Sequence, residues 1–190
     1  MIEPLIPSNE KERLASLYNL GILDTPTEER FDRITQTAKE IFDVPIALIT
    51  IIDVNRQWFK SCIGLDIKET PRGVSFCGHA ILQKEPFIIP DATKDERFAD
   101  NPLVTGSPHV IFYAGIPIAT IDGNNVGTLC IIDNKPREFS KQQINLLKNL
   151  AAWAEIELNS KNVALITSEQ QGVSKEIEAF FNSSYDLMWI

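Results

Sequence analysis

The residues best suited to chemistry are a cysteine and a histidine on either side of one glycine, Cys77-Gly78-His79. A thiol beside a base can serve as a nucleophile or as a redox group. Buried free cysteines are commonly inert, however. We therefore expect Cys77 to lie on the buried face of a helix, and His79 to form hydrogen bonds at the wall of a pocket.

No other spacing indicates a reaction centre. His79, His109 and the three cysteines lack the spacing of a metal site. The chain has no glycine-rich loop of the kind that holds phosphates. Cys130 falls in an expected buried strand, far along the chain from Cys77, and does not fit the position of a further reacting cysteine. We predict no catalytic residue and no metal, and we expect that the chain is not an enzyme.

The composition is that of a soluble domain. The 190 residues are 44% apolar and carry a net charge of −8, and this length suits one domain with some extra helix. An acidic chain repels phosphate backbones and anionic lipids, so we expect no nucleic acid partner and no membrane contact. The longest apolar stretch, residues 44–52, is far shorter than the roughly 20 residues of a bilayer span. The chain has only three cysteines, and this number argues against the disulfide framework of a secreted protein. We therefore predict a cytoplasmic module.

The pattern of hydrophobic residues predicts an α+β fold. Two helices come first: one follows Ser8 and stops at Gly21, and the other opens at Thr25-Pro26. Apolar strands with hairpin signals follow, interrupted by a crossing helix at residues 74–83. Together these elements predict a central antiparallel sheet of five or six strands, with helices on both faces and a long C-terminal helix. The expected strands cover residues 45–53, 56–63, 86–90, 110–118 and 126–133.

From Ser140 the chain reads as one long helix with two apolar rows. Either the helix packs only on the domain's own sheet, or one row meets a partner, and we favour a homodimer through this helix. After Gly172-Val173, a short helix (174–182) and an unpaired apolar strand (185–190) indicate the truncated start of another domain. The first row is Ile144, Leu147, Ala151, Ala154 and Leu158, and the second is Leu146, Leu150 and Trp153.

Short motifs spread over residues 10–160 give the chain a resemblance to a known family. They include Leu23-Asp24-Thr25-Pro26, Arg56-Gln57-Trp58-Phe59, Glu69-Thr70-Pro71-Arg72, Ser75-Phe76-Cys77, Asn101-Pro102-Leu103-Val104, Phe112-Tyr113-Ala114-Gly115 and Gly127-Thr128-Leu129-Cys130. Together they resemble the GAF domains of bacterial sensor kinases and cyclic-di-GMP enzymes. The stretch from Phe180 to Ile190 resembles the opening of a PAS domain.

The resemblance implies a regulatory module. GAF domains commonly bind a small molecule between the sheet and the helix-loop segment, while others only dimerise, and they control a downstream output domain. Such a signal requires a ligand with different affinities for two states of the module. The implied organisation is a GAF domain at residues 1–160, followed at residues 161–190 by a connecting helix and the start of a PAS-like domain.

The resemblance also places the candidate ligand site. We expect a pocket for an unidentified small molecule, with no cofactor assigned, and two alternatives stay open. Free-methionine-sulfoxide reductases share the GAF fold, and Cys77 would then be the reacting thiol. In a bilin-binding photoreceptor, Cys77 would instead carry the chromophore. The expected pocket residues are Phe76, His79, Asp91, Phe98 and Tyr113.

Overall fold

The computed structural model describes residues 1–160. The predicted connecting helix and PAS-like start fall on residues 161–190, outside the described residues, so the proposed domain boundaries stay a prediction. Within residues 1–160, no helix combines the length and the apolar character that a membrane span needs.

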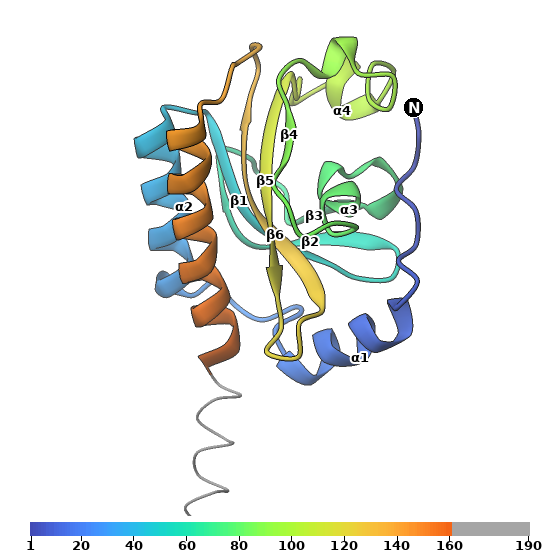
Figure 1. The fold of residues 1–190 in the computed structure, drawn as a ribbon, viewed down its shortest axis with the longest axis vertical. Helices are drawn as coiled ribbons and strands as arrows, with labels where there is room; N and C mark the ends of the chain where they lie inside the picture. The colour runs from blue at the N-terminus through green and yellow to red at the C-terminus, as the bar shows by residue number, and fades with distance from the viewer. Residues whose placement is uncertain (161–190) are drawn as a thin grey trace, which may run out of the picture. The chain divides into compact units, whose positions relative to one another are not determined.

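A six-stranded antiparallel sheet forms the centre of the fold, with the strand order β3-β2-β1-β6-β5-β4 (Figure 1). This confirms the predicted α+β fold with five or six strands. Every residue of β1 is buried, as expected for a central strand that is covered on both faces. The strands are β1 (Ile46–Ile52), β2 (Arg56–Ile63), β3 (Glu69–Pro71), β4 (Phe87–Ile89), β5 (Phe112–Ala119) and β6 (Asn125–Asp133).

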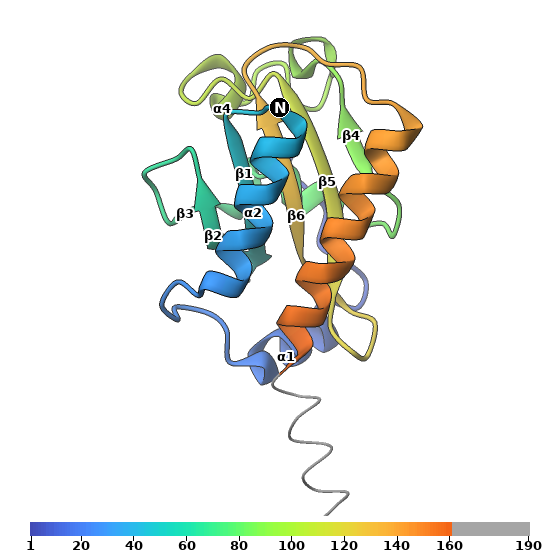
Figure 2. The ribbon, with the colours of Figure 1, turned by 90° about the vertical axis from the view of Figure 1, so that its left-hand side faces the viewer.

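Helices cover both faces of the sheet, as predicted. On one face α2 (Glu29–Phe42) lies beside the C-terminal helix, which begins at residue 141 (Figures 1 and 2). On the other face lie α3 (Phe76–Ala80) and α4 (Pro102–Thr105). Helix α1 (Glu10–Leu20) packs near one end of β6.

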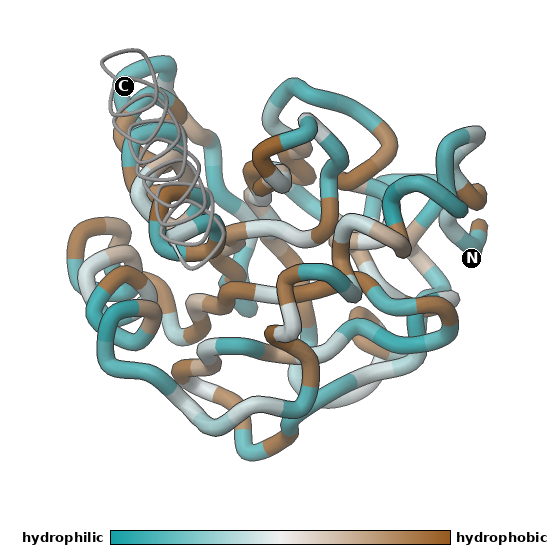
Figure 3. The backbone as a smooth tube through the Cα atoms, turned by 90° about the horizontal axis from the view of Figure 1, so that it is seen from below, coloured by the Kyte–Doolittle hydropathy of each residue, from teal (hydrophilic) through white to brown (hydrophobic). Residues whose placement is uncertain are grey.

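Each face of the sheet has its own hydrophobic core. The first core joins α2 and the C-terminal helix to the sheet and includes Phe31 and Ile34, while the second joins α3 to the sheet and includes Phe76 and Phe98. Each fully buried side chain of this size contributes about 1.5–3 kcal/mol of transfer free energy. The helices alternate between hydrophobic and hydrophilic stretches along their length, which is typical of amphipathic helices on a core (Figure 3).

The two apolar rows of the C-terminal helix face different surroundings. Four members of the first row, Leu147, Ala151, Ala154 and Leu158, are at most 4% exposed and belong to the core beneath the helix. This row therefore packs on the domain's own sheet. The second row splits, because Leu150 is buried while Leu146 and Trp153 are exposed. With Ile156, at 69% exposure, they leave an apolar strip on the outer side of the helix.

Three boundaries differ from the sequence prediction. The crossing helix is shorter than residues 74–83, because Arg72–Val74 form a 3-10 turn and Ser75 then caps α3. Helix α2 begins at Glu29 and not at Thr25-Pro26, since the Thr25 hydroxyl and the Pro26 carbonyl accept hydrogen bonds from buried Lys60. Residues Glu69–Pro71, expected only as a break in the chain, pair with β2 as an edge strand, where a proline is tolerated.

Candidate functional site

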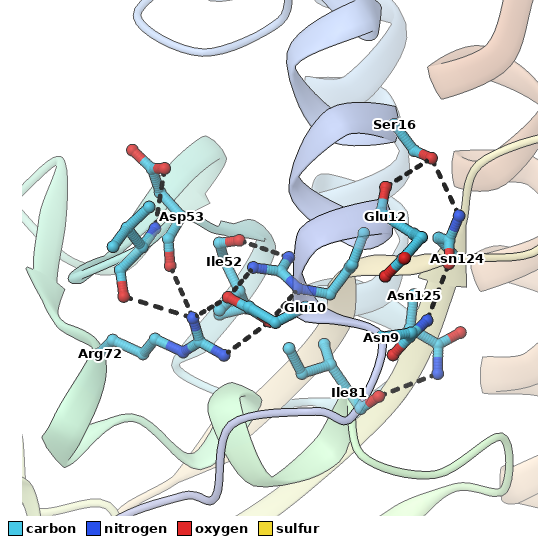
Figure 4. A network of polar contacts seen from close by, with 12 residues as sticks. Asn9, Glu10, Glu12, Ser16, Ile52, Asp53, Arg72, Ile81, Asn124 and Asn125 are labelled. Atoms are coloured by element: carbon cyan, nitrogen blue, oxygen red, sulfur yellow. Dashed lines mark hydrogen bonds and ion pairs between the residues drawn. The ribbon is translucent and has the colours of Figure 1, made fainter.

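A network of buried charges anchors the segment that leads into α3 (Figure 4). Arg72 is 4% exposed, and its Nη1 lies 2.5 Å from Oε1 of Glu10 at the start of α1. The same carboxylate accepts hydrogen bonds from Arg13, whose Nη1 also donates to the Ile52 carbonyl at the end of β1 (2.7 Å). Arg72 donates to the Asp53 carbonyl as well. The network therefore ties α1, β1 and the segment before α3 together.

Three of the predicted pocket residues form a packed aromatic cluster between α3 and the sheet. The Phe76 ring stacks on Phe98, with 4.0 Å between ring centroids, and lies 5.2 Å from the Tyr113 ring. Phe98 and Tyr113 are fully buried, and Phe76 is 3% exposed. The three rings thus pack against one another between α3 and the sheet.

His79 lies at the outer rim of this cluster. Its ring meets Phe98 edge-on, at 4.9 Å between centroids, and its Nε2 is 3.1 Å from the Ile2 carbonyl oxygen. Burial lowers the pKa of His79, so the imidazole is neutral at pH 7. Residues 1–7, which we call the N-terminal strap, therefore contact α3 from outside, and the Pro4 ring packs close to Gly78.

Asp91 does not join the aromatic contacts of this cluster. Its carboxylate caps the 3-10 turn Ala92–Lys94 by accepting a hydrogen bond from the Thr93 N–H (3.2 Å). It also pairs with Lys94, whose hydrogen bond lowers the pKa of Asp91. The contacts of Asp91 thus serve the local turn.

Two thiols meet beneath the aromatic cluster. Cys77 is 2% exposed on α3, which confirms the expectation that it lies on a buried helix face. Its Sγ is 3.7 Å from Sγ of Cys130 on β6 and accepts a hydrogen bond from the Tyr113 hydroxyl (3.2 Å). The fold thus brings the two cysteines into contact despite their separation along the chain, a contact that the sequence analysis did not anticipate.

A hollow of about 380 Å³ lies elsewhere, between the α1–α2 connection and β2. Its walls include Trp58 and Lys60, and the Lys60 ammonium is fully buried against the Glu28 carboxylate (2.6 Å). The sequence analysis did not single out this hollow. The signal available was a lysine within an expected strand, directly after Trp58-Phe59.

Comparison with known proteins decides the family. The sequence model of the GAF domain matches residues 26–158, which is most of the chain. The chain belongs to the GAF domain family. The motifs at both ends of this range thus indicated the family correctly.

This GAF domain has a relative among signalling enzymes. A cyclic di-GMP phosphodiesterase from Pseudomonas aeruginosa is 47% identical to it over 152 residues. The matched region is 80% of this chain and 26% of that enzyme, so the chain spans about a quarter of the length of this relative.

Solved structures share the fold at low sequence identity. The GAF domain of PixJ from Thermosynechococcus elongatus, in its blue-light absorbing form, superposes with a TM-score of 0.61 at 15% identity, covering 83% of this chain and 95% of that one. The GAF domain of a phosphoenolpyruvate-protein phosphotransferase from Acinetobacter gives 0.58 at 17% identity, with coverages of 82% and 98%. A free methionine-R-sulfoxide reductase from Thermoplasma acidophilum gives 0.57 at 16% identity, with coverages of 68% and 90%. These likenesses show the fold alone.

Proposed function

We propose that this GAF domain is a non-catalytic, cytoplasmic regulatory module of a cyclic-di-GMP signalling protein. The observation that carries the proposal is the 47% identity to a segment of a cyclic di-GMP phosphodiesterase that is 26% of that enzyme. A shared segment of this size, matching the GAF family over most of its length, is the regulatory part of such a protein and not its catalytic part.

The C-terminal helix is the element that transmits the signal in this proposal. Its inner row is locked into the core of the domain through Leu147, Ala151 and Ala154. A change in the sheet or in the opposite layer would therefore shift this helix. The helix is also the last element of the compact unit formed by residues 1–158. Packed cores transmit small displacements because they do not deform continuously.

The outer strip of this helix supports a homodimer. Leu146, Trp153 and Ile156 follow a spacing of seven and three residues, which keeps them on one face of a helix. Beside the strip, Trp153 and residues of α2 such as Arg33 and Thr37 line an open hollow of about 450 Å³. We propose that a second copy of the chain covers this strip.

The change Ile156→Glu should disrupt this dimer. A carboxylate at a position that is 69% exposed in the single chain leaves the fold intact, but it would be buried without a partner in the dimer. We expect light scattering after size exclusion to show a dimer for the parent chain and a monomer for the variant. Ala99→Glu, which places the same charge on an exposed loop on the other side of the sheet, is the control and should stay dimeric. If both variants match the parent chain, the strip is not the dimer interface.

Turnover assays test the non-catalytic part of the proposal. Cys77 is 2% exposed and accepts a hydrogen bond from Tyr113, so we expect its sulfur to be closed to substrates as large as methionine sulfoxide or a bilin. We expect no turnover of free methionine sulfoxide with a thiol reductant, no hydrolysis of cyclic di-GMP by this chain alone, and no covalent mass increase at Cys77 after incubation with a bilin. Turnover that disappears in Cys77→Ser would instead establish a reductase.

A further inference from the structure

The contact between Cys77 and Cys130 joins two different layers of the domain. Cys77 belongs to α3, a helix of five residues, and Cys130 to the middle of β6. Their Sγ atoms are 3.7 Å apart, and the side chains are 2% and 0% exposed. Both cysteines are free thiols in this structure.

The surroundings of the pair distinguish one thiol from the other. Burial, the largest influence, raises the pKa of Cys77, but hydrogen bonds from the Cys130 thiol, two threonine hydroxyls and Tyr113 outweigh it and lower the pKa below its usual value. Burial and the adjacent Cys77 hold the pKa of Cys130 well above its usual value. An attacking thiolate beside a neutral resolving thiol is the arrangement that oxidative disulfide formation needs.

We propose that Cys77 and Cys130 are an oxidation site of this GAF domain, at which hydrogen peroxide, an oxidant little larger than water, forms a reversible disulfide between α3 and β6. The Cys77 thiolate attacks one peroxide oxygen, the O–O bond breaks, and the leaving hydroxide takes up a proton to become water, which leaves a sulfenic acid on Cys77. The Cys130 sulfur then attacks the Cys77 sulfur, the S–O bond breaks, and one water leaves. The two thiols lose two protons and two electrons in total, and the peroxide accepts them as it becomes two waters.

The two sulfurs already lie within contact distance of each other. The sulfurs must approach from 3.7 Å to the disulfide length of about 2.05 Å. The two cysteines are separated by 53 positions in the sequence, so the bond would close a long loop and lock α3 onto the central sheet. Since α3 contacts the N-terminal strap through His79 and Gly78, the oxidised domain would hold this layer more rigidly than the reduced one.

The test uses the Cys62→Ser variant, which leaves the proposed pair untouched and removes the third thiol. After treatment of the folded protein with hydrogen peroxide, we expect the intact mass to fall by two hydrogens and peptide mapping to find Cys77 linked to Cys130. A dithiol reductant should restore the original mass. Amide hydrogen exchange at residues 76–80 should be slower in the oxidised protein than in the reduced protein.

Two results would overturn the proposal. In the first, Cys77 and Cys130 stay reduced in the folded protein, although the same peroxide treatment forms the disulfide in the denatured protein. In the second, peptide mapping finds oxygen added to Cys77 and no disulfide between Cys77 and Cys130. Cys130→Ser in the same background serves as the comparison and should show no loss of two hydrogens. Because mapping of the Cys62→Ser protein decides the question alone, the test does not depend on the stability of the Cys130 variant.

Discussion

Glu10→Gln should lower the free energy of unfolding by about 3 kcal/mol or more, because it leaves Arg13 and Arg72 buried together without a negative charge. The two arginines are 1% and 4% exposed, and each makes its ion pair with this one carboxylate. The neutral amide keeps one acceptor oxygen but cannot balance two guanidinium groups. Urea unfolding at pH 7 measures the loss.

A neighbouring carboxylate in the same helical turn supplies the control. Glu12 is exposed, so Glu12→Gln should change the unfolding free energy by less than about 0.5 kcal/mol. Equal losses in the two variants would show that the buried network does not hold the domain together.

The same network predicts the pH dependence of stability. Burial raises the pKa of Glu10, but hydrogen bonds from Arg13 and Arg72 outweigh it and lower the pKa from 4.5 to about 2. A carboxyl whose folded pKa is depressed stabilises the fold above its unfolded pKa, and this contribution is lost as the pH falls from about 4.5 towards 2. The contribution is at most about 3 kcal/mol, and solvent near the carboxylate reduces it. As the pH falls through this range, the free energy of unfolding of the Glu10→Gln variant should therefore decrease less than that of the parent chain.

Gly127→Ala should prevent stable folding, with a loss of more than about 4 kcal/mol. Gly127 lies in β6, paired with Ile51 of β1 and Ile118 of β5 at the centre of the sheet. A methyl group there would overlap the backbone carbonyl of Thr50, which cannot move aside as a flexible side chain could. Circular dichroism and urea unfolding of the purified variant would show the loss.

Gly21→Ala separates this steric effect from the general cost of replacing a glycine. Gly21 ends α1 with a φ of +57°, and a methyl group there would meet nothing within 4 Å. Its only penalty is the left-handed backbone, about 1–2 kcal/mol. If Gly127→Ala were no more destabilising than Gly21→Ala, the close approach of β6 to β1 would not be the reason for a glycine in β6.

The fold could be predicted because its main signals are local. The continuous apolar run of β1 requires cover on both faces, and the Phe31, Ile34 and Ala38 stripe of α2 has helical spacing. The edge strand β3 could not be predicted in this way. Its three residues are mostly exposed, so they carry no pattern of buried positions. The strand is recognised only by its pairing with β2.

The site could be predicted only in part, because its state depends on contacts between distant segments. The sequence indicated Phe76, Phe98 and Tyr113 as neighbours, but it could not show that their rings stack on one another. It also gave no sign that Cys130 would reach Cys77, since that contact follows from the position of α3 over β6. Asp91 was a reasonable candidate from its sequence context, yet its own turn uses its hydrogen bonds.

The regulatory role is tested most directly in a chimera. The matching segment of the Pseudomonas aeruginosa cyclic di-GMP phosphodiesterase would be replaced by this GAF domain, and hydrolysis of cyclic di-GMP would be measured with the parent domain, with Ile156→Glu and with Ala99→Glu. A regulatory module that acts through its C-terminal helix predicts an active chimera whose rate changes several-fold with Ile156→Glu and stays unchanged with Ala99→Glu. Equal rates for all three versions, and for an enzyme that lacks the segment, would contradict this account.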